Sequence, residues 1–194
     1  MKWTLPNILT LLRIVLIPVL VIVFFLQSRY SYQLSTAIFG LAAITDWLDG
    51  YFARRLKQLS VFGAFLDPVA DKLMVAVALV LLVQDNPTAL FAVPASIIIC
   101  REIAISALRE WMSEIGERTR VAVSVIGKIK TITQMVAILL LLYKVPLGPL
   151  PTHEVGVVLL YVAALLTLWS MLVYLRAAWP ILSGGSGQDE AGDA

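Results

Sequence analysis

The chain has 194 residues, of which 60% are hydrophobic and 14% are charged. This composition is too apolar for an ordinary water-soluble domain and indicates an integral membrane protein. The formal net charge of +2 gives no basis for nucleic-acid binding, and the single Cys100 excludes a disulfide framework.

The first ten residues are amphipathic and predict a short interfacial helix ahead of the first membrane span. The apolar run over residues 8–26 follows. It is longer than a signal-peptide core and lacks a cleavage site, so it predicts a retained transmembrane helix. Asn7, Thr10 and Arg13 are spaced three apart and share roughly one face of that helix. Two interpretations stay open for them: a helix cap with a snorkelling arginine, or one polar wall of an active site.

Five further apolar runs approach the length of about 20 residues that a span requires. They cover residues 34–51, 71–83, 89–108, 121–143 and 155–175. The run 71–83 is short and needs preceding residues to reach across. We therefore predict an all-α integral membrane protein with six transmembrane helices, forming a single domain over residues 1–182. The polar tail, residues 183–194, is rich in Gly and Ser and is predicted to be disordered.

The basic residues predict the orientation of the chain. Six spans place both termini on one side of the membrane, and thirteen of the fifteen Lys and Arg residues fall on that side. The two exceptions are Arg29 and Lys144. The positive-inside rule then places both termini in the cytoplasm.

Four aspartates lie between the second and third predicted spans, at Asp46, Asp49, Asp67 and Asp71. The first two are three residues apart and the last two are four apart, so each pair shares a helical face, and we expect each pair at a helix end. Four carboxylates that close repel one another unless cations neutralise them. Hard divalent ions with oxygen ligands suit this chemistry, and two of them would balance the four charges. A purely structural role is a poor explanation, because charge within a membrane is costly.

A second polar stretch contains several cations. Arg101 and Arg109 are eight residues apart and lie near one helical stripe. A solvated loop explains Arg118 and Arg120 well, but it explains Arg101 less well, because apolar helix surrounds that residue. Neighbouring cations at the mouth of a helical bundle favour a phosphate site.

Two lysines in the fifth predicted span compete for a place in this site. Lys128 and Lys130 project about 200° apart on a helix, so only one of them is expected to face the phosphate. Lys128 is the preferred candidate, because it follows Gly127 directly.

The aspartates belong to a longer pattern, D-x2-D-G-x2-A-R-x8-G-x3-D-x3-D. Its eight fixed positions are Asp46, Asp49, Gly50, Ala53, Arg54, Gly63, Asp67 and Asp71. This pattern resembles the signature of the CDP-alcohol phosphatidyltransferase family. The resemblance implies transfer of a phosphatidyl group from a CDP-linked lipid to an alcohol, with loss of CMP. It also implies a homodimer. The expected location is a bacterial-type inner membrane, and the positive-inside rule places the four aspartates, like both termini, on its cytoplasmic face.

The resemblance further implies roles for individual residues. The four aspartates would hold two Mg²⁺ or Mn²⁺ ions, and Asp71 would act as the general base. The residues expected to bind the donor, CDP-diacylglycerol, are Asp49, Gly50, Ala53, Arg54, Gly63 and Asp67.

Features outside the signature look like the branch of the family that makes phosphatidylglycerophosphate from sn-glycerol 3-phosphate. They are the stretch 7–13, Arg101-Glu102, the run ending at Arg109, and the segment from Gly127 to Gln134. The acceptor's phosphate would then rest on Arg101, Arg109 and Lys128. The alternatives are a sibling enzyme with another acceptor (cardiolipin, inositol phosphate or serine type) and, less favoured, a divalent-cation transporter.

Overall fold

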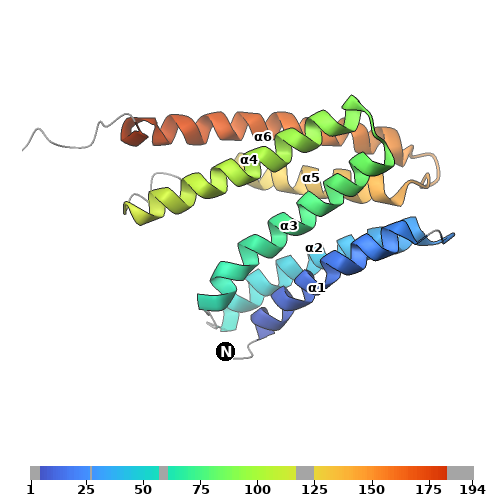
Figure 1. Ribbon diagram of the computed structural model, residues 1–194, viewed down its shortest axis with the longest axis horizontal. Helices are drawn as coiled ribbons and strands as arrows, with labels where there is room; N and C mark the ends of the chain where they lie inside the picture. The colour runs from blue at the N-terminus through green and yellow to red at the C-terminus, as the bar shows by residue number, and fades with distance from the viewer. Residues whose placement is uncertain (1–4, 27, 57–60, 117–124, 183–194) are drawn as a thin grey trace, which may run out of the picture.

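The structure, a computed structural model, describes residues 5–26, 28–56, 61–116 and 125–182. Within these ranges only the backbone is described at residues 5, 6, 47, 49–56, 61, 62, 64, 65, 125, 126, 128 and 180–182. This part of the chain forms six α-helices and no strand (Figure 1). The helices are α1 (Leu5–Phe25), α2 (Ser31–Leu56), α3 (Val61–Asp85), α4 (Ala89–Glu114), α5 (Val125–Tyr143) and α6 (Thr152–Leu182).

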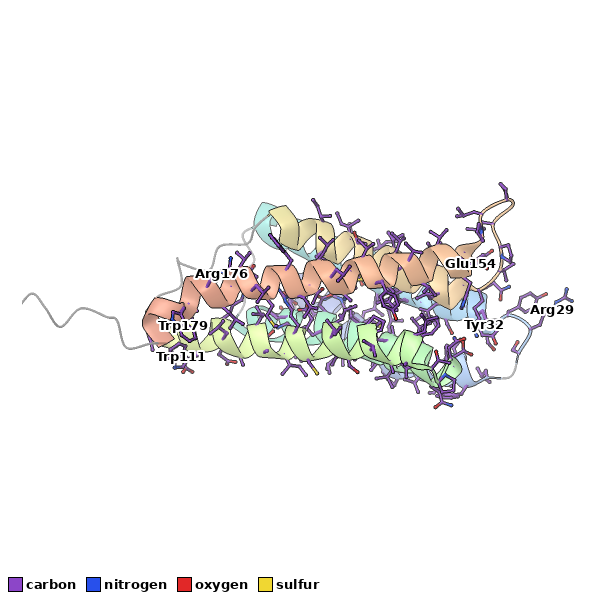
Figure 2. All side chains as sticks on the ribbon, turned by 90° about the horizontal axis from the view of Figure 1, so that it is seen from above. Arg29, Tyr32, Trp111, Glu154, Arg176 and Trp179 are labelled. Atoms are coloured by element: carbon purple, nitrogen blue, oxygen red, sulfur yellow. The ribbon has the colours of Figure 1, made fainter. Side chains whose placement is uncertain are left out.

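The helices form one elongated bundle. α1 packs against α2 and α3, α5 packs against α6 and α2, and α4 packs against α3 and α6. Trp111, Arg176 and Trp179 lie at one end of the bundle, whereas Arg29 and Tyr32 lie at the other (Figure 2). We call these the tryptophan end and the Arg29 end. The start of α1, the end of α2 and the start of α3 all lie toward the tryptophan end (Figure 1).

The surface of the bundle is apolar and part of its interior is polar. On α1, large apolar side chains are exposed, namely Ile8, Leu12, Val15, Val19 and Ile22. The polar side chains of Asn7, Thr10 and Arg13 on the same helix are buried. This pattern is the reverse of that in a water-soluble helix, and it suits a helix whose outer face contacts lipid.

By length and composition, three helical stretches are able to cross a membrane: Asn7–Phe25, Ala89–Glu114 and Thr152–Trp179. The stretch Ile129–Tyr143 is apolar but shorter. The sequence also predicted spans within α2 and α3. Over the described residues, these two helices are not among the three stretches. In α3 the charged residues Asp67, Asp71 and Lys72 precede the apolar run, and in α2 the side chains of residues 47 and 49–56 are not described.

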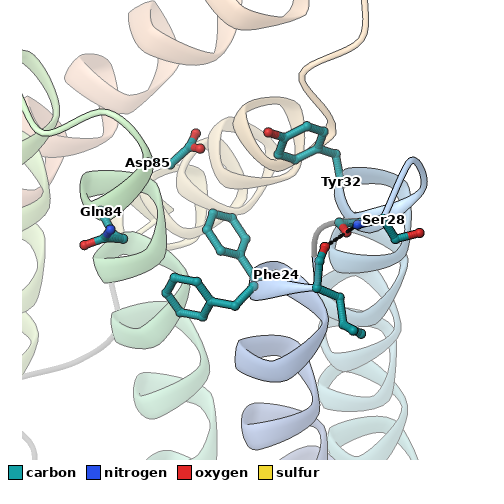
Figure 3. A pocket seen from close by; sticks show the side chains of 8 residues that line it. Phe24, Ser28, Tyr32, Gln84 and Asp85 are labelled. Atoms are coloured by element: carbon teal, nitrogen blue, oxygen red, sulfur yellow. Dashed lines mark hydrogen bonds between the residues drawn. The ribbon is translucent and has the colours of Figure 1, made fainter.

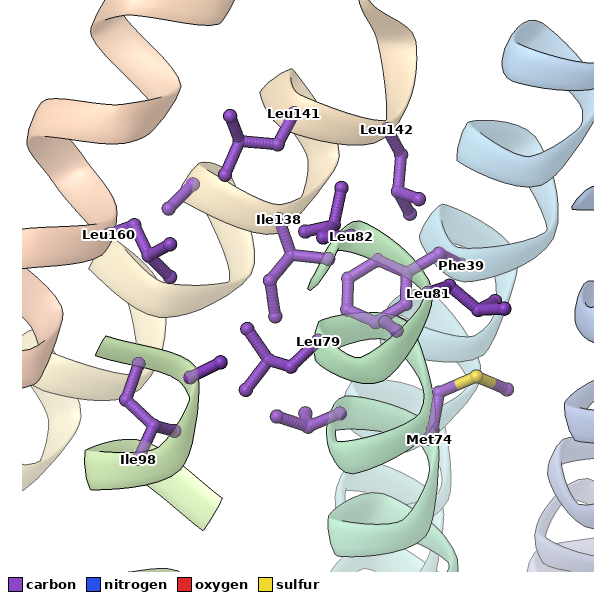
Figure 4. Packing of buried hydrophobic residues seen from close by; sticks show 14 of the residues in the cluster. Phe39, Met74, Leu79, Leu81, Leu82, Ile98, Ile138, Leu141, Leu142 and Leu160 are labelled. Carbon is purple, nitrogen blue, oxygen red and sulfur yellow. The ribbon is translucent and has the colours of Figure 1, made fainter. Parts of the chain in front are cut away.

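A single apolar core joins all six described helices, with Leu16 and Leu20 contributed by α1 (Figure 4). Its fully buried members include Phe39 from α2, Leu79 from α3, Ile98 from α4, Ile138 from α5 and Leu160 from α6. The pair α5 and α6 is especially close at Gly156, where a Cβ atom would lie 2.8 Å from Leu141 Cγ. The short connection between these two helices turns at Gly148, which has a φ of 61° that favours glycine.

Two sequence predictions differ from the structure. The expected interfacial helix is not separate, because Leu5 already begins α1 and the helix continues without a break to Phe25. The third helix is also longer than the predicted run 71–83, since α3 begins at Val61 and continues through Pro68. The polar residues ahead of the apolar run were therefore mistaken for a connection. The predicted disordered tail, residues 183–194, lies outside the described residues.

Candidate active site

Three of the four aspartates have described side chains, and all three lie inside helices. Asp46 belongs to α2, which continues to Leu56, and Asp67 and Asp71 belong to α3, which has already begun at Val61. The expectation that each pair stands at a helix end was therefore wrong. The helices extend past the aspartates on both sides, so the carboxylates project from the helix flanks and not from its termini.

Helix α1 provides a polar partner for an aspartate of each neighbouring helix. Arg13 Nη1 lies 2.8 Å from Asp46 Oδ1 in an ion pair. The Thr10 hydroxyl donates a hydrogen bond to Asp67 Oδ1. Arg13 is only 1% exposed, which a snorkelling arginine would not be, whereas the Asp46 side chain is 41% exposed. Asn7 is buried one turn earlier on the same stripe. The geometry thus brings Thr10 and Arg13 of α1 together with Asp46 and Asp67 in one polar region.

Asp71 faces a small cavity of about 60 Å³ between α3, α4 and α5. Lys72 lines it from α3, Glu102 from α4, and Lys130 and Gln134 from α5. Asp71 is also close enough to Asp46 and to Glu102 for electrostatic repulsion between the carboxylates. The cavity therefore joins the aspartate region to the second polar stretch found in the sequence.

Lys130 is one of two described lysines that line this cavity, the other being Lys72. It is buried and pairs with Glu102. Gln134, one helical turn further along α5, is also buried, and its Oε1 has no hydrogen-bond partner among the described residues. The sequence interpretation preferred Lys128 to Lys130. The side chain of Lys128 lies outside the described residues, so that preference stays a prediction, but Lys130 clearly belongs to the cavity.

The two arginines of α4 meet on one tyrosine of α6. Arg101 Nη2 donates to Ser170 Oγ at 2.8 Å, and Arg101 Nη1 donates to Glu102 Oε1 at 3.2 Å. Arg109 Nη2 donates to the Tyr174 hydroxyl oxygen at 2.6 Å. Both guanidinium groups also contact the Tyr174 ring, with Cζ at 5.5 Å from its centroid for Arg101 and 5.0 Å for Arg109. The arrangement is a cluster of cations held by hydrogen bonds and cation–π contacts.

Sequence reasoning missed the α6 contribution to this cluster. Ser170 and Tyr174 are four residues apart in an otherwise apolar helix, and both are buried. Polar side chains at helical spacing within such a helix share a face, which is the signal that points to them. The sequence analysis gave these two residues no role and treated them only as part of the apolar run over residues 155–175.

For several predicted site residues the structure describes only the backbone. They are Asp49, Gly50, Ala53, Arg54 and Lys128, whose side chains are outside the described part. Gly63 is buried within the first turn of α3. The donor-binding predictions for these residues therefore remain predictions.

The donor chemistry of the aspartates fits a hard divalent cation, since carboxylate oxygens are its preferred ligands. The two carboxylates of Asp46 and Asp71 repel each other, which a cation would relieve. Among the described side chains, however, no three carboxylate, histidine or cysteine groups converge on one point. A complete ligand set would thus need Asp49, whose side chain is not described, or a rearrangement of the carboxylates.

A separate pocket of about 360 Å³ lies at the Arg29 end of the bundle (Figure 3). Phe24, Ser28, Tyr32, Gln84 and Asp85 are among its lining residues. It contains none of the residues that the sequence analysis proposed for a site. The charged residues Asp71, Lys72, Glu102 and Lys130 line the smaller cavity beside Asp71 instead.

These features define a membrane-embedded helical protein with an aspartate pair on one helix face and a cation cluster beside it. Residues 3–169 match the family model for CDP-alcohol phosphatidyltransferase. The chain belongs to this family.

Curated relatives are similar over nearly their whole length. A protein of Salmonella choleraesuis (strain SC-B67) is 52% identical over 92% of this chain and 96% of its own length. A protein of Pseudomonas fluorescens is 53% identical over 91% of both chains. A protein of Shigella flexneri serotype 5b (strain 8401) is 52% identical over 92% of this chain. All three are named CDP-diacylglycerol--glycerol-3-phosphate 3-phosphatidyltransferase.

Proposed function

We propose that this chain transfers the phosphatidyl group of CDP-diacylglycerol to sn-glycerol 3-phosphate, giving phosphatidylglycerophosphate and CMP. The observation that carries the proposal is the near full-length identity of 52–53% to relatives that bear the name of this activity. The complete eight-residue signature, from Asp46 to Asp71, supports the same reaction class.

The donor would bind at the signature residues. Asp49, Gly50, Ala53, Arg54, Gly63 and Asp67 are the residues assigned to it. Gly50 and Ala53 have small side chains, which allow a nucleotide to approach the backbone of α2 closely. Arg54 would pair with a phosphate of the donor.

The family is generally dependent on divalent metal ions. Asp46, Asp49, Asp67 and Asp71 would hold two ions, Mg²⁺ or Mn²⁺, and bound ions would supply charge neutralisation for the pyrophosphate and the departing CMP. Thr10 and Arg13 would orient Asp67 and Asp46, since carboxylates that bind a metal are commonly held by further hydrogen bonds.

Asp71 would act as the general base. It would accept the proton of the acceptor's attacking hydroxyl while the hydroxyl oxygen forms a bond to the phosphorus that bears the diacylglycerol. The bond between that phosphorus and the CMP oxygen breaks, and CMP leaves with the electron pair. The position of Asp71 on the cavity beside Lys130 supports this role, because an acceptor bound there would lie next to the carboxylate.

The acceptor's phosphate would rest on Arg101, Arg109 and Lys128. The shared contact of Arg101 and Arg109 with Tyr174 supports a common anion site for the two arginines. Lys130 is a further cation of this region, and its pairing with Glu102 keeps it beside the cavity.

In the cell the protein would be a multi-pass protein of a bacterial-type inner membrane. All six helices would span the bilayer as one domain over residues 1–182, with both termini and the active site on the cytoplasmic side. Two copies would form a homodimer. The tryptophans at the same end as the start of α3 fit an interfacial belt at that membrane surface.

The acceptor is tested by supplying membranes that contain the protein with CDP-diacylglycerol and one radiolabelled alcohol at a time. Label from sn-glycerol 3-phosphate is expected in the lipid fraction, with CMP released in equal amount. Label from serine, inositol phosphate or phosphatidylglycerol, without label from sn-glycerol 3-phosphate, would instead identify a sibling enzyme. Membranes without the protein provide the background.

A further inference from the structure

Tyr174 lies between the two arginines of the cation cluster. It is 5% exposed and projects from α6 toward α4. Arg101 and Arg109 are eight residues apart on α4, which corresponds to about 12 Å along a helix. The ring of Tyr174 nevertheless contacts both guanidinium groups. Tyr174 therefore connects two arginines that lie too far apart on α4 to share a contact without it.

The two arginines depend on Tyr174 to different degrees. Arg101 is buried and also hydrogen-bonds Glu102 and Ser170. Arg109 is exposed, and its contacts within the described part of the chain are both with Tyr174: the hydrogen bond of 2.6 Å and the cation–π contact. Arg101 therefore has other anchors, whereas the orientation of Arg109 rests on the tyrosine.

Fixing Arg109 in advance matters for anion binding. A free arginine loses considerable rotamer entropy when it binds, and an arginine already held in place loses less. The tyrosine oxygen occupies one N–H of Arg109, and a guanidinium has five, so donors remain for a phosphate.

We propose that Tyr174 is a positioning residue for the acceptor: its hydroxyl and ring hold Arg109 in the orientation that receives the acceptor's phosphate. This inference rests on the proposed function, in which Arg109 contacts that phosphate. It assigns to α6 a part in selecting an anionic acceptor over an uncharged alcohol.

The test uses purified full-length protein and four variants: Tyr174→Phe, Arg109→Ala, the double variant, and Tyr161→Phe. Tyr174→Phe removes one oxygen and keeps the ring, so packing between α4 and α6 is nearly unchanged. Tyr161 lies on the same helix and makes no contact with either arginine in the described structure, so Tyr161→Phe is the matched control. KM is measured for sn-glycerol 3-phosphate and for CDP-diacylglycerol, together with the melting temperature.

Tyr174→Phe is expected to raise KM for sn-glycerol 3-phosphate roughly two- to tenfold, the scale of one hydrogen bond, and to leave KM for CDP-diacylglycerol unchanged. In the Arg109→Ala background the same substitution is expected to add nothing, because the group it positions is absent. Tyr161→Phe is expected to match the wild type.

The inference is overturned if Tyr174→Phe leaves the acceptor KM unchanged, or if it raises KM equally with and without Arg109. An equal rise in both substrates' KM with a lower melting temperature would also overturn it, since that outcome marks a packing role. If Arg109→Ala itself leaves the acceptor KM unaltered while CDP-diacylglycerol is still converted, the proposed acceptor site fails first, and the inference falls with it.

Discussion

Each end of the bundle carries an aspartate paired with a cation, and the two pairs differ in which partner is open to solvent. Toward the tryptophan end, Arg13 is 1% exposed while Asp46 is 41% exposed. At the Arg29 end, Lys144 pairs with Asp85, and the two side chains are similarly half-buried. Lys144 is also covered by the ring of Tyr32, whose centroid lies 4.3 Å from Nζ.

The Arg13–Asp46 pair is therefore accessible to a ligand through Asp46, whereas the Lys144–Asp85 pair is covered by protein on both partners. Asp46 keeps a large accessible surface although its partner is buried, so it remains available to a cation or a substrate. Lys144 and Asp85 join the end of α3 to the connection before α6, and Tyr32 closes the group from α2. We therefore expect substitutions at the first pair to alter chemistry, and substitutions at the second to alter stability slightly.

Loss of the metal should have the largest effect. Asp46→Ala and Asp67→Ala each remove an expected ligand, and we predict loss of activity in both variants. EDTA should inactivate the wild type, and Mg²⁺ or Mn²⁺ should restore it, as followed by release of CMP. Asp85→Ala is the matched control at the other end and should keep its metal-dependent activity. Full activity in EDTA would reject the role proposed for the metal.

Asp71→Asn should have the next largest effect, because it removes the base with little change in volume. We predict that turnover falls by at least ~10²-fold, the usual scale for losing general-base catalysis. Binding of CDP-diacylglycerol to the purified variant, measured by titration, should persist. Near-normal turnover would show that another group accepts the proton.

Arg109→Ala should act on one substrate only. A charge-assisted contact with phosphate contributes roughly 1.5–3 kcal/mol, so kcat/KM for sn-glycerol 3-phosphate should fall about ten- to hundredfold. Steady-state assays with each substrate varied in turn should show little change for CDP-diacylglycerol. Plain glycerol should be a poor acceptor for the wild type. In Arg109→Ala, the difference in kcat/KM between sn-glycerol 3-phosphate and glycerol should be smaller. A defect confined to the donor would move the cation cluster to the donor site.

The smallest effect is expected at the Arg29 end. Lys144→Met removes the cation of a partly exposed pair, and such pairs contribute roughly 0–1 kcal/mol. The melting temperature in detergent should fall slightly, and kcat and both KM values should match those of the wild type. A catalytic defect in Lys144→Met would break the distinction between the two ends.

The sequence predicted the number and order of the described helices correctly, but it predicted their lengths less well. Every predicted span corresponds to a described helix, although only three of the described stretches are long and apolar enough to cross a membrane. The limits of α2 and α3 were missed, since their charged segments resemble loops when neighbours are unknown. Helix α3 continues through Pro68, a residue that ordinarily favours a break.

The site was predictable where it is local in sequence. The aspartates share a short motif, and the spacing of Thr10 and Arg13 already suggested a polar face. Tyr174 could not be assigned in the same way, because its partners on α4 are 65 or more residues away and only tertiary packing brings them together. The burial of Lys130 likewise depends on Glu102 from another helix.

The close approach at Gly156 has a mechanical consequence for the cation cluster. Helices α5 and α6 form a hairpin that is pinched where Gly156 meets Leu141, near the turn. One arm carries Lys130 and the other carries Tyr174, which is eighteen residues or about 27 Å of helix beyond the pinch. A methyl group at Gly156 would push α5 and α6 apart at Leu141. Because the two helices are stiff, their separation would increase further along the hairpin, toward Lys130 and Tyr174. The separation between Lys130 on α5 and Tyr174 on α6, which holds Arg109, thus depends partly on a residue that bears no side chain.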